Sequence, residues 1–418
     1  MYFIAWCLVF FTSFKKMRSL NTYNVIVLSY AIYAFISIFC YTWFSSEFND
    51  ITFFPFIYLF LMLMIALQPV KQYEESDIRI CKGNNMKIIY AVFFLFIITS
   101  IVVLPSALSK LNQGIIVMLT RDDGATDLYR EMHGNAVLGA NSKGGIVGWC
   151  KIIRYLLFEI TVFSFFYYLI FSEKKNTGLV CFLLFCFLID VIISLADGNR
   201  TASTMSMFTL FITTLLFYRF MTKKLKTIIQ KIGIVFIGIF CFFTLVVTIG
   251  RSTTRDGGAI EGMAEYLGQA NLYFNEYALT QDGLRNGDRT CNYFKNMLGF
   301  DNVPKSIKQV RYKYPNLKLN DHNFSTFVGD FVIDFGPILT TILFIILSLI
   351  FCRITKSKQG VIRLDQLLFI QLTADICMHG GMYLFYYSFS GNFIIIMYIL
   401  FAIVLRLNSR KTFICINN

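Results

Sequence analysis

A series of long apolar runs, separated by short clusters of lysine and arginine, constrains this chain most strongly. A transmembrane helix needs about 20 mainly apolar residues, and a helix that is apolar all round faces lipid or a protein core. Eleven runs approach this length: Met1–Phe14, Asn24–Phe44, Ile51–Gln68, Met86–Leu104, Ile152–Phe171, Leu179–Ala196, Ser203–Phe220, Ile232–Ile249, Val328–Phe351, Leu364–Phe385 and Phe393–Leu407. The pattern predicts an all-α, polytopic integral membrane protein with about eleven transmembrane helices, forming a single membrane domain over residues 1–418.

The placement of the basic residues explains the net charge of +13, which by its size alone would be compatible with a nucleic-acid partner. If the N-terminus lies outside, the short basic clusters all fall in the inner loops. The short outer connections then contain a single cation, Arg200. This asymmetry is the positive-inside pattern, which sets orientation in the membrane. We therefore expect membrane lipid as a partner and no nucleic acid.

Two long outer loops are predicted, at residues 105–151 and 250–327. Loops longer than about 15 residues are usually functional. The inner loops are short and lack a glycine-rich phosphate-binding signature, so the working surface is expected outside the cytoplasmic membrane. Two amphipathic pieces of the second loop, Glu261–Leu267 and Tyr273–Leu279, are expected to form short helices that lie on the membrane or cap a cavity.

Three arginines follow the outer ends of predicted helices. Arg200 lies in the turn between two apolar runs, and Arg251 and Arg255 open the second long loop among glycine and hydroxyl residues. Arginine forks bind phosphate groups, and glycine-rich backbone can turn its amides toward an anion. The alternatives are a snorkelling arginine that anchors a helix end, and an ordinary polar loop. We predict that these three residues bind substrate phosphates.

The segment from Asp321 to Pro337 leads from the second loop into an apolar run and contains the predicted catalytic residues. His322 suits a base near neutral pH, and Asp330 and Asp334 lie four residues apart, on one face of a helix. Ionisable groups inside membrane segments are functional candidates. The alternatives are a solvated loop histidine and an aspartate that favours the helix dipole.

Tyrosine and asparagine are frequent in the second loop, and Tyr273 is the tyrosine that we predict to bind substrate. Aromatic faces and amides suit the stacking and hydrogen bonding of sugars, although membrane interfaces also enrich tyrosine. No Asp-x-Asp pair occurs in the outer loops, so we expect no metal site. No cofactor is predicted either.

With these features, the chain resembles the Wzy group of bacterial oligosaccharide repeat-unit polymerases, which includes the O-antigen polymerases. The resemblance covers the layout of helices and loops. In residues it rests on Gly198-Asn-Arg-Thr, Gly250-Arg-Ser, His322-Asn323, Gly329-Asp330 and Asp334-Phe335-Gly336.

The resemblance implies a membrane glycosyltransferase of the bacterial cytoplasmic membrane, with its active site facing the periplasm or the outside. It would transfer a glycan from undecaprenyl pyrophosphate to a new lipid-linked repeat unit, for O-antigen or capsular polysaccharide. A partner that regulates chain length is expected. On this interpretation Arg200 and Arg251, with Arg255 as a second candidate, bind pyrophosphate. His322 is the base, supported by Asp330 or Asp334.

Four other functions stay open at this point. An O-antigen ligase shares the outer arginines and the His-Asn pair. A flippase for lipid-linked sugars would need a charged cavity among the helices, and an acyltransferase would need a donor route from the cytoplasm. A scaffold protein would leave the buried carboxylates and outer arginines without a role.

Overall fold

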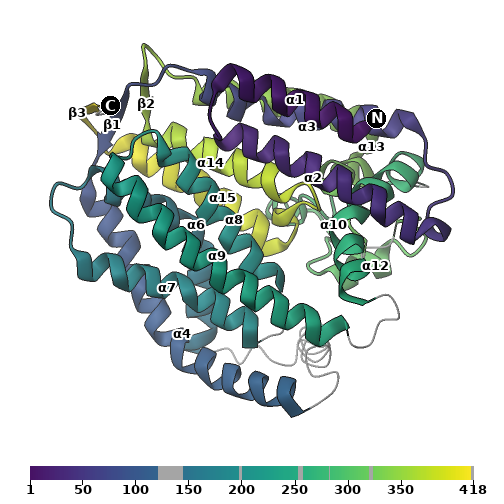
Figure 1. The fold of residues 1–418 in the computed structure, drawn as a ribbon, viewed down its shortest axis with the longest axis horizontal. Coiled ribbons are helices and arrows are strands. Elements are labelled where there is room, and N and C mark those ends of the chain that lie inside the picture. Colours follow the sequence, from purple (N-terminus) through teal and green to yellow (C-terminus); the bar gives the residue numbers. More distant parts are fainter. Residues whose placement is uncertain (121–144, 197–199, 253–257, 282, 320–322, 416–418) are drawn as a thin grey trace. The chain divides into compact units, whose positions relative to one another are not determined.

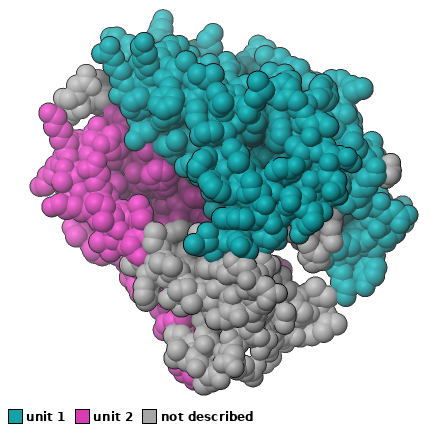
Figure 2. Space-filling view, turned by 45° about the vertical axis from the view of Figure 1, so that its right-hand side comes forward, with its two compact units in different colours: residues 1–82, 260–407 teal, residues 83–259, 408–418 magenta. Residues whose placement is uncertain are grey.

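The structure is a computed structural model that describes residues 1–418 except 121–144, 197–199, 253–257, 282, 320–322 and 416–418. The chain forms two compact units (Figure 2). Unit 1 contains Met1–Lys82 and Ile260–Leu407, and unit 2 contains Gly83–Ala259 and Asn408–Asn418. The described part of both units is predominantly helical (Figure 1).

Unit 1 contains most of the apolar helices and all the residues of the site described below. Its helices are α1 (Tyr2–Met17), α2 (Thr22–Trp43), α3 (Phe53–Glu75), α10 (Gly258–Tyr277), α11 (Asn292–Met297), α12 (Ile307–Lys313), α13 (Thr326–Thr355), α14 (Leu364–His379) and α15 (Phe389–Leu407). Three short 3-10 helices are η1 (Ser45–Glu47), η2 (Ala278–Thr280) and η3 (Phe385–Tyr387). Strands β1 (Ile80–Asn84) and β2 (Val361–Arg363) pair in parallel, with Ile80 opposite Val361.

Unit 2 is a group of long helices with one terminal strand. It contains α4 (Met86–Thr120), α6 (Ile146–Phe171), α7 (Thr177–Ala196), α8 (Arg200–Tyr218), α9 (Lys223–Ser252) and β3 (Ser409–Cys415). Aromatic side chains fill the space between α4, α6 and α7, where Phe96, Phe158 and Phe187 pack with ring centroids 5.7 to 6.4 Å apart. Such contacts fit the phenylalanine-rich composition of these helices.

Within the described residues, five helical segments are long and apolar enough to cross a membrane. They are Thr22–Trp43, Phe53–Glu75, Met86–Gly114, Thr326–Thr355 and Phe389–Leu407. Helix α13 shows the kind of surface that such a segment has, because large apolar side chains project from it: Ile338 is 78% exposed and Leu349 is 66% exposed. Lipid is the medium that such a surface requires. The prediction of a helical membrane protein is confirmed at this level.

The predicted boundaries of both long loops differ from the structure. Helix α4 continues through Pro105 to Thr120, and α6 begins at Ile146, so much of the predicted loop 105–151 is helical. Proline is tolerated inside membrane helices when neighbouring groups satisfy the freed backbone. In the second loop, the first predicted amphipathic piece and most of the second belong to one continuous helix, α10, and the last two residues of the second begin η2. The second half of α10 is buried inside unit 1 instead of lying on a membrane.

Close packing of α10 on α2 holds this helix in unit 1. At Gly268, a Cβ atom would lie 2.8 Å from Cβ of Cys40 and 3.0 Å from the carbonyl oxygen of Ile36, so only glycine fits without a shift. The Ser37 hydroxyl donates to the carbonyl of Gly268, and the Asn271 amide donates to the Ser37 hydroxyl. The sequence 250–327 therefore contributes an integral part of the helical unit.

Helix α13 is broken at Gly336, where φ is 77° and ψ is 164°. This conformation is accessible essentially to glycine alone, and the following Pro337 has no amide hydrogen to continue the helix. The segment 326–335, called the half-helix below, therefore ends with carbonyls that have no hydrogen-bond partner within the helix. The backbone amides of Arg285 and Asn286 donate to the carbonyls of Ile333 and Asp334 and satisfy them.

Candidate functional site

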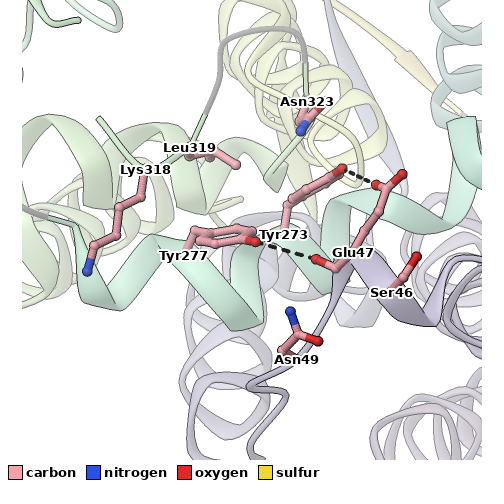
Figure 3. Close-up of a pocket in the computed structure, with 8 residues that line it drawn as sticks. All are labelled: Ser46, Glu47, Asn49, Tyr273, Tyr277, Lys318, Leu319 and Asn323. Carbon is pink, nitrogen blue, oxygen red and sulfur yellow. Dashed lines mark hydrogen bonds between the residues drawn. The ribbon is translucent and has the colours of Figure 1, made fainter. Parts of the chain in front are cut away.

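A polar pocket of about 360 Å³ lies at one end of the apolar helices of unit 1 (Figure 3). The connection between α2 and α3, helix α10, and the chain that approaches α13 line it. The lining residues are Ser46, Glu47, Asn49, Tyr273, Tyr277, Lys318, Leu319 and Asn323. Three of the five candidate membrane spans, α2, α3 and α13, end or begin within a few residues of this pocket.

Two tyrosines and one carboxylate form the centre of the pocket. Tyr273 and Tyr277 lie one turn apart on α10, with ring centroids 5.9 Å apart and an angle of 26° between the rings. The Tyr273 hydroxyl donates to Glu47 Oε2 at 2.8 Å, and the Tyr277 hydroxyl donates to the Glu47 carbonyl at 3.4 Å (Figure 3). Burial, together with the neighbouring Glu47, raises the pKa of Tyr273 well above its usual value, so this hydroxyl keeps its proton at neutral pH.

Side chains of α10 also fix the backbone between α2 and α3. The Asn275 side chain accepts from the Thr52 amide at 2.9 Å and donates to the Thr52 carbonyl at 2.7 Å, so it hydrogen-bonds to both backbone groups of one residue. Glu276 accepts from the Asn49 amide at 3.1 Å. Because both side chains are buried, these bonds hold the pocket wall in place without depending on solvent.

Asp334, one of the predicted catalytic residues, lies in a buried ion pair. Its Oδ1 atom accepts from Arg285 Nε at 2.6 Å. Its Oδ2 atom accepts from the Thr290 amide and hydroxyl, both at 2.7 Å, and from the Arg289 amide at 3.3 Å. The Asp334 side chain is fully buried, so its carboxylate serves to hold the loop 284–291 against the half-helix.

Asp330, one helical turn earlier, is held by the same loop and by the turn after α14. Its Oδ2 atom accepts from the Leu384 amide at 2.8 Å, and its Oδ1 atom lies 3.1 Å from Arg289 Nε. The Arg289 guanidinium also lies 4.8 Å from the ring centroid of Tyr387. Asp330 and Asp334 do share one helical face, as the spacing predicts, and that face binds Arg285 and Arg289.

The first turn of the half-helix is capped by the chain that follows α14. The amides of Thr326 and Phe327 donate to the carbonyls of Met382 and Gly380, at 2.8 and 2.9 Å. Helix α14 ends at His379, earlier than the predicted run to Phe385, and this early end frees those carbonyls. The backbone groups at both ends of the half-helix thus hydrogen-bond to backbone groups of neighbouring segments and not to the rest of α13.

The remaining predicted site residues lie partly inside and partly outside the described part of the chain. His322 and Arg255 lie outside the described residues. Arg200 begins α8 and Arg251 lies near the end of α9, but their side chains also lie outside the described part. Tyr273 lies in the pocket, and Asn323, the residue after His322, lines the same pocket. Asp330 and Asp334 do not line it.

Sequence reasoning did not select Glu47, Arg285 or Arg289, and of the tyrosines in the second loop, which include Tyr277, it selected only Tyr273. Glu47 lies in a short connection that reads as an ordinary turn, and only the fold brings it to Tyr273. The two arginines form the spacing Arg285-x-x-x-Arg289, which matches the spacing of Asp330 and Asp334. That equal spacing was a signal for charge pairing between the two segments. Among the described residues, no three His, Cys, Asp or Glu side chains gather to hold a metal ion.

Comparisons with known proteins identify no relative of this chain. No family model matches it, and neither the curated proteins nor the solved structures searched contain a match.

Proposed function

We propose that this protein is a membrane glycosyltransferase that polymerises lipid-linked oligosaccharide repeat units at the outer face of the bacterial cytoplasmic membrane. The donor is a glycan on undecaprenyl pyrophosphate, and the acceptor is a sugar of a new lipid-linked unit. The observation that carries this proposal is the pocket of Glu47, Tyr273 and Tyr277 beside the ends of apolar helices. A lipid-linked sugar needs both a polar pocket and an adjacent lipid phase.

The chemistry of the lining residues supports a sugar ligand. Tyrosine rings offer apolar faces to the C–H faces of a pyranose, while Asn49 and Asn323 offer amide donors and acceptors. Glu47 Oε2 is held by Tyr273, and Oε1 has no hydrogen-bond partner among the described residues. A carboxylate fixed in this way accepts hydrogen bonds from sugar hydroxyls.

The proposed reaction moves the glycan from pyrophosphate to the acceptor hydroxyl. The acceptor oxygen forms a bond to the anomeric carbon as the bond from that carbon to the pyrophosphate oxygen breaks. His322 takes the proton of the hydroxyl, and undecaprenyl pyrophosphate leaves with the electron pair. Arg200, Arg251 and Arg255 stabilise the charge that develops on the pyrophosphate. Tyr273 and Glu47 position the acceptor.

Asp330 and Asp334 take a supporting role in this proposal. Their carboxylates bind Arg285, Arg289 and backbone amides, so they act by fixing the half-helix, which follows His322 in the chain. In the same proposal the eleven apolar runs all cross the membrane, and the two long connections lie outside. A partner that sets chain length would act from that side.

The first experiment is a gel of surface polysaccharide from cells that lack this protein. Collapse of the ladder to a single repeat unit is the expected result. An unchanged ladder would contradict the proposal. Core lipid without any attached repeat would indicate a ligase or a flippase instead.

Matched tyrosine variants then test the pocket. Tyr273→Phe keeps the ring but removes the hydroxyl that holds Glu47, whereas Tyr312→Phe changes an exposed tyrosine that does not line the pocket. A hydrogen bond to a charged group contributes about 1.5–3 kcal/mol, so Tyr273→Phe should lower kcat/KM about tenfold or more. The assay follows chain extension by purified protein in lipid nanodiscs. Equal rates for the two variants would remove Tyr273 from the proposed site.

A further inference from the structure

An exposed apolar tip follows helix α11. Met297 is 63% exposed, Leu298 71% and Phe300 57%, and Gly299 lies between them. Three large apolar side chains in four consecutive residues are unusual on a surface that faces water. This stretch, called the 297–300 tip, requires a partner that covers it.

The base of the tip is anchored at the start of a candidate membrane span. The ring of Tyr293 packs against Phe389 and Phe393 in the first turns of α15, with centroid distances of 4.6 and 5.4 Å. The Tyr293 amide also donates to the Asn392 side chain at 3.3 Å. At about 1.5 Å of rise per helical residue, Met297 lies roughly 6 Å along α11 from Tyr293. The tip therefore follows closely on a residue that packs against the first turns of a candidate membrane span.

Basic side chains surround the tip. Residues 295–313 contain five basic residues and one acidic residue. The ammonium group of Lys308 lies 5.8 Å from the centroid of Tyr312, whereas those of Lys295 and Lys313 pair with the carboxylate of Asp288. Lysines beside exposed aromatic and aliphatic side chains are typical of segments that lie in the headgroup region of a bilayer.

We propose that the 297–300 tip inserts into the interfacial layer of the membrane, with Lys305 and Lys308 binding anionic lipid headgroups. The apolar side chains are buried among the acyl chains, and the lysines remain at the level of the lipid phosphates. Insertion gives the loop 284–291 a second attachment to the membrane in addition to α13. This inference does not depend on the proposed catalytic activity.

Photo-crosslinking in intact cells tests the proposal. Benzoylphenylalanine is placed at Phe300, at Leu347 on the exposed side of α13 as a lipid-facing reference, and at Tyr277 in the polar pocket. Mass spectrometry of the purified protein then identifies the adducts. We expect phospholipid adducts at position 300 with a yield within about threefold of that at position 347, and at least tenfold less at position 277. Protein adducts at position 300, or no adduct there while position 347 reacts, would overturn the proposal.

A charge variant tests the role of the lysines separately. Lys305→Glu combined with Lys308→Glu should reduce the fraction of anionic phospholipid among the adducts at position 300 by threefold or more. Lys356→Glu combined with Lys358→Glu, just beyond the C-terminal end of α13, makes the same change in total charge and serves as the control. An unchanged lipid composition at position 300 would refute headgroup binding by these lysines.

Discussion

Replacing Asp334 by alanine should destabilise unit 1 strongly, because this carboxylate accepts four hydrogen bonds within a buried ion pair. The substitution leaves the Arg285 guanidinium buried, with one carboxylate fewer to neutralise it, and removes the acceptor of the Thr290 amide and hydroxyl. Breaking a buried ion pair by removing one partner costs about 3–5 kcal/mol. At about 2–4 °C per kcal/mol for a unit of this size, we expect Tm to fall by about 10 °C.

Thermal unfolding of the detergent-purified protein, followed by size-exclusion chromatography, measures this effect. The matched control is Asp301→Ala, which removes an exposed aspartate from the same part of the chain. Adding Arg285→Met to Asp334→Ala should recover part of the loss, because the buried cation leaves as well. If Asp334→Ala stays within about 2 °C of Asp301→Ala, Asp334 does not hold the loop, and a direct catalytic role regains support.

Two further predictions concern packing and pH. Gly268→Ala should destabilise the protein by about 1–3 kcal/mol, because the added methyl group meets Cys40 and the backbone of α2; Gly233→Ala, with open space around it, should be neutral or stabilising, and equal Tm values would contradict this packing argument. Burial alone would raise the pKa of Asp288, but hydrogen bonds from Lys295, Lys313 and Tyr314 lower it below its ordinary value. Its contribution to stability is therefore fully present above the ordinary value of about 3.9 and is lost as pH falls through the lower folded pKa. Tm measured against pH should lose this acid dependence in Asp288→Asn, and an unchanged profile would show that another group controls it.

The apolar pattern predicts the helices well because length and composition alone determine whether a segment can be helical in lipid. Each predicted run overlaps a helix of the described part, although α14 ends at His379, before the predicted end at Phe385, and Pro105 does not end α4. In water, proline usually ends a helix, and the carbonyls that it leaves without a partner bond to solvent. In a membrane those carbonyls must bond to neighbouring protein groups, and the sequence does not show which groups these are. The sequence around Gly336 and Pro337 likewise has the pattern of an uninterrupted apolar run, so it does not predict the break in α13.

The candidate site is harder to predict because its members come from distant parts of the chain. Tyr273 could be selected by its residue type and its place in an outer segment. Glu47 could not, because it lies 226 residues away and only the packing of α10 on α2 brings the two together. The pairing of Asp334 with Arg285 is also a property of the fold. A short-range pattern predicted that the aspartates share a face but not what that face contacts.

The two capped ends of the half-helix imply an order of events during biosynthesis. The amides of Arg285 and Asn286, which satisfy its last carbonyls, precede α13 in the chain and have already been synthesised when α13 leaves the ribosome. The carbonyls of Gly380 and Met382, which accept from its first amides, follow only after α14. One end can therefore close as α13 is inserted, while the other waits for the next hydrophobic segment. A nascent chain truncated between residues 355 and 379 would expose the first turn of the half-helix to quality-control proteases.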